Sequence, residues 1–98
     1  MEVQEIKELI NRRRRQILVH SYIYYQLNDN IIEDNIYDKW SKELIELQNN
    51  YPELAATIPY HEEFKEFDGS TGFDLPKDNW TISIALKILR YKDKYLHN

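Results

Sequence analysis

The chain of 98 residues has no cysteine, and it has only two glycines and three prolines. Without cysteine it can form no disulfide, thiolate metal site or thiol nucleophile. So few glycines and prolines argue against a disordered or fibrous chain and against an all-β fold with many tight turns. No stretch approaches the roughly 20 apolar residues of a membrane span, and the N-terminus does not resemble a signal sequence. We therefore expect one cytoplasmic domain, residues 1–98, with no membrane association.

The formal net charge of −4 is unevenly distributed. Residues 1–27 carry a net +2, residues 28–78 a net −9, and residues 79–98 a net +3. A broad nucleic-acid footprint needs lysine and arginine spread over one face, which the acidic middle discourages. Contact with nucleic acid is therefore expected to be weak if it occurs at all, and confined to the termini.

Apolar residues near the N-terminus recur at intervals of three and four, the spacing of one face of an amphipathic helix. The main series consists of Val3, Ile6, Ile10, Ile17, Tyr24 and Leu27. A second series, which widens this face, consists of Leu18, Tyr22 and Tyr25. Residues 28–30, which are Asn-Asp-Asn, compete with the helix for backbone hydrogen bonds and end it. The sequence thus predicts a long helix from Val3 to Leu27.

A second helix is predicted from Asp34, acting as its N-cap, to about Asn50, because Pro52 disfavours helix at the preceding residue. Its apolar face carries Ile36, Tyr37, Trp40, Leu44, Leu47 and Tyr51. The link between the two helices is short and polar, which favours an antiparallel hairpin over residues 5–54.

Residues 55–79 are expected to be irregular, with one or two helical turns between His61 and Phe67 and a loop at 68–72. A last helix is predicted over residues 80–96, capped by Asp78 or Asn79. Its buried stripe would be Ile84, Ile88, Tyr91 and Tyr95, while Phe64, Phe67, Phe73 and Trp80 would pin the irregular segment onto the helices. The predicted fold is all-α, an antiparallel helical hairpin covered by a third, C-terminal helix.

Aromatic and acidic residues meet where the two hairpin helices join. Tyr24 and Tyr25 end the first helix, and Asp34, Tyr37 and Asp38 share a face of the second. Tyrosine faces attract a cationic heterocycle and carboxylates accept hydrogen bonds from ribose hydroxyls, so the five residues could form a nucleotide pocket. Alternatively, Asp34 is only a cap, Asp38 a solvated residue favoured by the helix dipole, and the tyrosines ordinary core residues.

Four segments in register resemble domain Ia, the N-terminal helical domain of bacterial NAD-dependent DNA ligases. They are HSYIYY at 20–25, DNIYD at 34–38, ELIEL at 43–47 and YPEL at 51–54. The resemblance covers about residues 5–54. It implies a helical domain that closes over NAD and holds its nicotinamide mononucleotide (NMN) half, while a lysine of a separate adenylation domain attacks the adenylyl phosphorus. It also associates the chain with DNA replication and repair.

The resemblance implies a role for each of the five residues. Tyr24 and Tyr37 would contact the nicotinamide ring, and Tyr25 would reach toward ribose or phosphate. Asp34 and Asp38 would accept hydrogen bonds from the carboxamide or the ribose.

The sequence also departs from the ligase pattern. Residues 28–30 replace the family's D-x-P turn, and the nucleophilic K-x-D-G motif is absent, because KEFDG at 65–69 has one residue too many. The chain is therefore not expected to be an enzyme on its own. No H-E-x-x-H pair surrounds His61, so we expect no metal site.

Two other features have competing interpretations. The run Arg12–Arg15 points all round its helix, so it either contacts a phosphate or forms a solvated face whose stems cover apolar surface. His20 lies on the apolar face and is expected to be a hydrogen-bonded interior histidine.

Three functional hypotheses follow. The first is a stand-alone domain Ia-like module that binds NMN or NAD and works in trans with an adenylation domain, or modulates an NAD-dependent DNA ligase. The second is a protein-interaction module that keeps the hairpin without the ligand. The third is nucleic-acid binding through Arg12–Arg15 and the basic C-terminus.

Overall fold

The computed structural model describes residues 2–69 and 72–95, and it consists there of helices and connecting segments with no strand. Ser70, Thr71 and residues 96–98 lie outside the described residues, as does the side chain of Tyr95. The helices are α1 (Val3–Gln26), α2 (Asp34–Asn50), α3 (Pro52–Ala55), α4 (His61–Phe64) and α5 (Asn79–Tyr95). The all-α prediction is confirmed.

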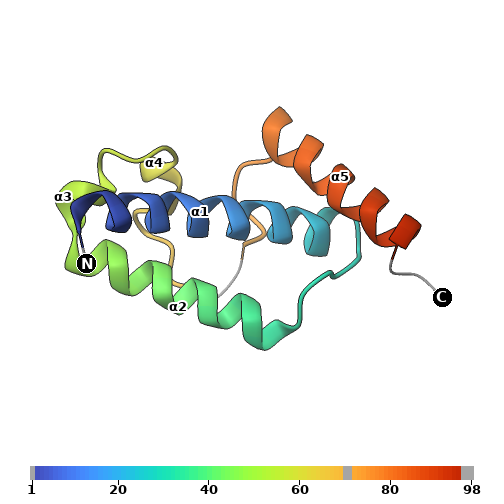
Figure 1. Cartoon of the computed structure of the whole chain (residues 1–98), viewed down its shortest axis with the longest axis horizontal. Coiled ribbons are helices and arrows are strands. Elements are labelled where there is room, and N and C mark those ends of the chain that lie inside the picture. The colour runs from blue at the N-terminus through green and yellow to red at the C-terminus, as the bar shows by residue number, and fades with distance from the viewer. Residues whose placement is uncertain (1, 70–71, 96–98) are drawn as a thin grey trace.

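The helix α1 is the axis around which the molecule is arranged (Figure 1). The second helix, α2, runs antiparallel along it, and the short helices α3 and α4 cover the end near the N-terminus. The last helix, α5, crosses the other half of α1, so the third helix rests on one member of the hairpin rather than over both. No described helix is long and apolar enough to cross a membrane.

The helix ends follow local side-chain chemistry, with one correction. Asn28 adopts a left-handed conformation (φ 52°), which asparagine tolerates, and ends α1 where expected. Asp78 caps α5, accepting a 2.8 Å hydrogen bond from the Thr81 backbone N–H. The predicted cap at Asp34 is wrong. Glu33 holds the N-cap position without a side-chain hydrogen bond, so Asp34 lies in the first turn, where its charge favours the helix dipole.

The apolar faces are mostly buried as predicted, but six of their residues are exposed, namely Val3, Tyr24, Tyr25, Ile36, Tyr51 and Tyr91. Val3 is exposed because it begins α1, and Tyr24, 52% exposed, lies near the loop that joins the two hairpin helices. Tyr91 is 59% exposed, because α5 turns Thr81 and Ala85 inward instead. The predicted α5 stripe is therefore only partly right.

The core has two parts, both built on α1. The larger lies between α1, α2 and the segment from α3 to Leu75, and it contains the fully buried Phe64. The smaller joins α1 to α5 through Val19, Ile23 and Ala85. Of the other predicted aromatic anchors, Phe67 packs against the larger core. Phe73 and Trp80, 53% and 38% exposed, lie outside both cores but contact Tyr25 and Arg15.

Arg14 is fully buried, which neither interpretation of the arginine run anticipated. Its Nε donates a 2.9 Å hydrogen bond to Gln48 Oε1, and its Nη1 donates to the carbonyls of Ile58 and Pro59 at 2.9 and 3.1 Å. Gln48 in turn donates to the Phe64 carbonyl at 3.0 Å. Burial lowers the pKa of Arg14 to about 10, which leaves it charged at neutral pH. One cation thus ties α1 to α2 and to the chain that follows α3.

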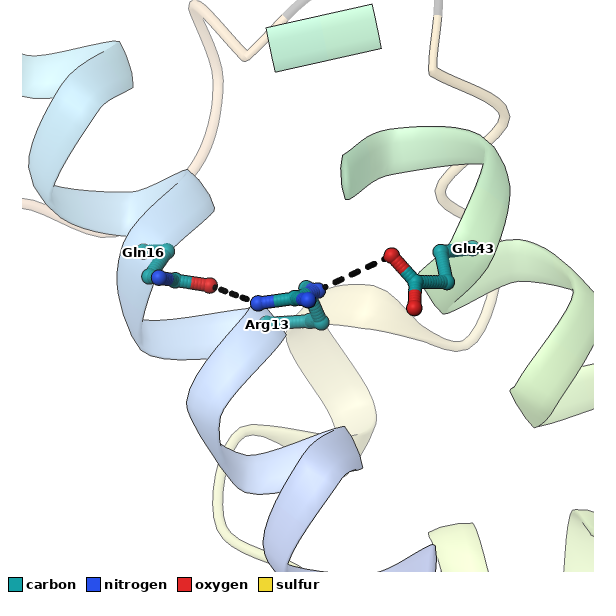
Figure 2. Close-up of polar contacts among 3 residues, drawn as sticks. All are labelled: Arg13, Gln16 and Glu43. Carbon is teal, nitrogen blue, oxygen red and sulfur yellow. Dashed lines mark hydrogen bonds and ion pairs between the residues drawn. The ribbon is translucent and has the colours of Figure 1, made fainter. Parts of the chain in front are cut away.

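The neighbours of Arg14 have different environments. The Arg13 guanidinium donates to Glu43 on α2 at 3.2 Å and to Gln16 at 2.6 Å (Figure 2). The Arg15 guanidinium lies over the rings of Tyr60 and Trp80, 5.5 and 4.7 Å from their centroids. Of the four arginines only Arg12 is exposed, so the run is not one solvated face.

Replacing Arg14 with alanine is expected to lower the free energy of unfolding by roughly 3 kcal/mol, because it leaves a cavity and removes the donor from three partly buried acceptors. The matched control is Arg12→Ala, which should change stability by no more than about 0.5 kcal/mol. Urea denaturation of both variants checks this. A similar small loss in both would contradict the structural role of Arg14.

Candidate functional site

A cavity of about 250 Å³ lies at the loop end of the hairpin, where the last turns of α1 face the first turns of α2. All five residues predicted from the sequence line it. The full lining is His20, Ser21, Tyr24, Tyr25, Asn30, Ile31, Ile32, Asp34, Tyr37, Asp38 and Gly69. Two helices and the intervening loop therefore bring one aromatic and acidic set together.

The tyrosines form the aromatic part of the cavity. The rings of Tyr24 and Tyr25 meet edge to face with centroids 4.9 Å apart, and Tyr25 meets Phe73 in the same way at 5.7 Å. Such contacts orient the rings and add to the apolar area that they bury. Tyr24 and Tyr25 are 52% and 37% exposed, so a ligand can reach them.

Tyr37 lies deeper, and its hydroxyl is already engaged. Its Oη and the Ser21 Oγ form a 2.7 Å hydrogen bond between α2 and α1. Burial raises the pKa of the Tyr37 phenol, and the Ser21 hydrogen bond only partly offsets this effect. Tyr37 therefore stays protonated at neutral pH, and its ring is the part that the cavity can offer to a ligand.

The charge of the cavity is negative. Asp34 and Asp38 are exposed residues one turn apart on α2. Among the described residues that line the cavity there is no lysine or arginine. The two carboxylates therefore favour a cationic or hydroxyl-rich ligand over a phosphate.

His20 differs from its prediction. It is half-buried, its ring centroid lies 5.6 Å from that of Trp40, and its buried Nδ1 has no hydrogen-bond partner among the described residues. Burial lowers the pKa of His20, so the imidazole is neutral at pH 7. The prediction that His20 forms a hydrogen bond in the interior is therefore wrong for its Nδ1.

The spacing argument did not identify the other lining residues. Ser21 belongs to the same α1 segment as the tyrosines, but nothing in the periodicity indicates its bond to Tyr37. Gly69 lies 31 residues beyond Asp38, in a segment predicted to be an irregular loop.

Neither in the cavity nor in the rest of the described chain is a group of three or more histidine, cysteine, aspartate or glutamate residues placed to hold a metal ion.

His20 is expected to titrate below the ordinary histidine pKa of about 6.5. Since the unfolded chain then binds the extra proton more tightly, the free energy of unfolding should fall as pH drops from about 6.5 through the lowered pKa. NMR titration of the imidazole and denaturation at several pH values test this. In Trp40→Ala, which uncovers the ring, the pKa should rise toward its ordinary value. A wild-type pKa at or above the ordinary value would contradict the effect of burial.

Comparison with known proteins places this hairpin in a family. Residues 3–57 match the model of the DNA ligase-like, N-terminal NAD+-binding domain. The chain is 49% identical over 53 residues to the DNA ligase of Thermotoga petrophila and to that of Pseudothermotoga lettingae, which is 54% of this chain and 8% of each ligase. It is 47% identical over 56 residues to the DNA ligase of Thermosipho africanus, which is 57% of this chain and 8% of that protein.

No solved structure matches the chain significantly. The chain thus spans less than a tenth of the length of these ligases, and its α4, its α5 and the segment between them lie beyond the matched residues. The family match nevertheless covers more than half of the chain and includes ten of the eleven residues that line the cavity. The chain therefore belongs to the family of DNA ligase-like, N-terminal NAD+-binding domains.

Proposed function

We propose that the chain binds the NMN half of NAD in the cavity between α1 and α2. The observation that carries this proposal is the gathering of Tyr24, Tyr25, Asp34, Tyr37 and Asp38 around one cavity in a domain of an NAD+-binding family.

The chemistry of the cavity suits the nicotinamide end of the dinucleotide. The oxidised nicotinamide ring is flat and cationic, so it is attracted both to tyrosine faces and to carboxylates. A volume of about 250 Å³ lies below the roughly 300–1,000 Å³ of sites for drug-sized ligands, which favours part of the dinucleotide over the whole. The cavity wall contributes no basic residue, so the phosphate would point out of it.

The side chains then have separate tasks. The rings of Tyr24 and Tyr37 contact the nicotinamide, and Tyr25 reaches toward ribose or phosphate. Asp34 and Asp38 accept hydrogen bonds from the carboxamide or the ribose hydroxyls. Because Ser21 already engages the Tyr37 hydroxyl, Tyr37 acts through its ring.

We further propose that the chain acts together with an adenylation domain, in trans or as a modulator of an NAD-dependent DNA ligase. The 98 residues contain no K-x-D-G motif, so the attacking lysine must come from elsewhere. A half-site that holds only one end of the dinucleotide obtains only part of the binding energy, so weak affinity is expected without a partner.

A protein-interaction module is the second candidate. It is favoured by the outer face of α5, where Leu86 is 43% exposed and Tyr91 59% exposed. Apolar side chains at such exposure are typical of an interaction surface only when they form a larger patch. The nucleotide site therefore remains the better supported function.

The cationic ring gives a direct test by NMR titration. Wild-type protein is expected to bind NMN several-fold more tightly than reduced NMN, whose ring is uncharged. Asp38→Asn should weaken NMN binding by about fivefold and reduce this preference, because it removes one of two carboxylates at the site. Asp74→Asn removes an exposed carboxylate outside the cavity and is the matched control. Absence of chemical-shift changes at the lining residues at millimolar NMN would overturn the proposal and favour the interaction module.

The partner proposal has its own assay. A ligase fragment that lacks its N-terminal domain but keeps the adenylation domain is incubated with NAD, and lysine adenylation is measured. Adding this chain should increase the rate in a saturable manner, whereas the Tyr37→Ala variant should increase it much less. Equal stimulation by both forms would show that the cavity is not involved, and no stimulation would argue against action in trans.

A further inference from the structure

The chain beyond the family-matched segment returns to the cavity. Gly69 forms part of its wall, although residues 58–98 lie outside the matched region. Gly72 lies directly behind the Ser21–Tyr37 hydrogen bond. A segment with no counterpart in the family match therefore contacts two of the side chains that shape the site.

The approach at Gly72 is too close for any side chain. A Cβ atom built there would overlap the Ser21 hydroxyl and would stand 2.6 Å from the Tyr37 hydroxyl and 2.7 Å from Ser21 Cβ. Gly72 is itself buried. Glycine is thus required because the backbone covers the hydroxyl pair, which is one of the ordinary uses of glycine.

The chain after Gly72 is held firmly in place. The Leu75 side chain is buried in the larger core, and its N–H donates a 3.2 Å hydrogen bond to the Gly72 carbonyl. The Lys77 ammonium donates to the carbonyls of Phe73 and Leu75 at 2.9 and 3.3 Å. Phe73 in turn packs against Tyr25. The residues from Gly72 to Lys77 therefore form a fixed support behind the Ser21–Tyr37 pair rather than a loosely held linker.

A second contact supports the opposite wall. The Lys92 ammonium on α5 forms a 3.0 Å ion pair with Asp29, in the loop that contributes Asn30, Ile31 and Ile32 to the cavity. Ile31 also packs against the smaller core, which contains Ala85 of α5. The C-terminal part of the chain thus supports both the side of the cavity formed by α1 and α2 and the side formed by the loop between them.

We propose that Gly72 is a positioning residue for the nucleotide site, and that the segment from Gly72 to Lys77 fixes the Tyr37 ring by covering the Ser21–Tyr37 hydrogen bond. This inference rests on the proposed function only for its ligand. The structural part of the inference, which does not depend on the ligand, is that the C-terminal part of this chain shapes the cavity without a neighbouring domain. Preorganisation of this kind reduces the ordering that a ligand must otherwise impose.

The test is the Gly72→Ala variant, with Asp74→Ala as a control in the same segment, where Asp74 is exposed and outside the cavity. Gly72→Ala should weaken NMN binding by about tenfold, because the added methyl displaces Ser21 or Tyr37. Asp74→Ala should bind NMN as the wild type does. Thermal denaturation of both variants confirms that they are folded.

A second measurement needs no ligand. Covered by Gly72, the Tyr37 phenol should titrate above the ordinary tyrosine pKa in the wild type, as followed by NMR of ring-labelled tyrosine. In Gly72→Ala this pKa should change, because displacing the pair alters both the burial that raises it and the Ser21 hydrogen bond that lowers it, and in Asp74→Ala it should not change. If Gly72→Ala does not fold, Ser21→Ala removes the same hydrogen bond without overlap and should weaken NMN binding by a smaller factor.

The outcomes separate this inference from the proposed function. If wild type does not bind NMN but the Tyr37 titration responds to Gly72→Ala, the ligand is wrong and the positioning role stands. If wild type binds NMN while Gly72→Ala changes neither affinity nor the Tyr37 titration, the positioning role is refuted.

Discussion

The fold depends on one buried cation. A guanidinium withdrawn from water is costly unless its donors meet acceptors. The Nε and Nη1 of Arg14 find acceptors on α2 and on the chain after α3, whereas its buried Nη2 has no partner among the described residues. Because two of these acceptors are backbone carbonyls, the bonds fix the path of the chain as well as its side chains. Gln48 extends the network to Phe64, whose ring fills the larger core. The direction in which the chain leaves the hairpin is thus set by a polar requirement rather than by apolar contact alone.

This arrangement has consequences for the site at the other end of the hairpin. Once the chain has been directed back along α1, Leu75 can enter the core and Gly72 can reach the Ser21–Tyr37 pair. Asp78 then accepts hydrogen bonds from the Tyr60 hydroxyl at 2.5 Å and from the first turn of α5, which holds the start of that helix near Arg15. Beyond the 55 residues of the family match, α4 thus covers the end of the hairpin near the N-terminus, whereas the described residues from Gly72 onward pack nearer the cavity.

Much of the fold followed from periodicity. The hairpin helices were predicted to within a residue or two, because apolar spacing, the asparagine at 28 and the proline at 52 are all local signals. The five residues expected at a pocket do line one cavity, because they lie on turns that a hairpin must bring together.

Three of the errors come from long-range contacts, unlike the misplaced cap at Asp34. In the sequence, nothing distinguishes Arg14 from the other three arginines of the run. Two of its acceptors, the carbonyls of Ile58 and Pro59, belong to residues 44 and 45 positions away. Gly72 looks like an ordinary loop glycine in the sequence, which does not reveal that its backbone packs against Ser21. The stripe of α5 was misassigned at Tyr91 because helical spacing alone does not reveal which side faces α1. Each of these three errors concerns a pairing between distant segments, which no local pattern encodes.

The division of the core along α1 has a consequence for cooperativity. Among the described residues, the smaller core contains three buried residues, Val19, Ile23 and Ala85, whereas the larger contains nine. Since less apolar surface holds α5 than holds the hairpin, we expect α5 to be the weaker cooperative unit and to open while the hairpin remains folded. Such opening would release Asp29 from Lys92 and loosen one wall of the cavity, so partial unfolding of a remote helix is coupled to the shape of the site.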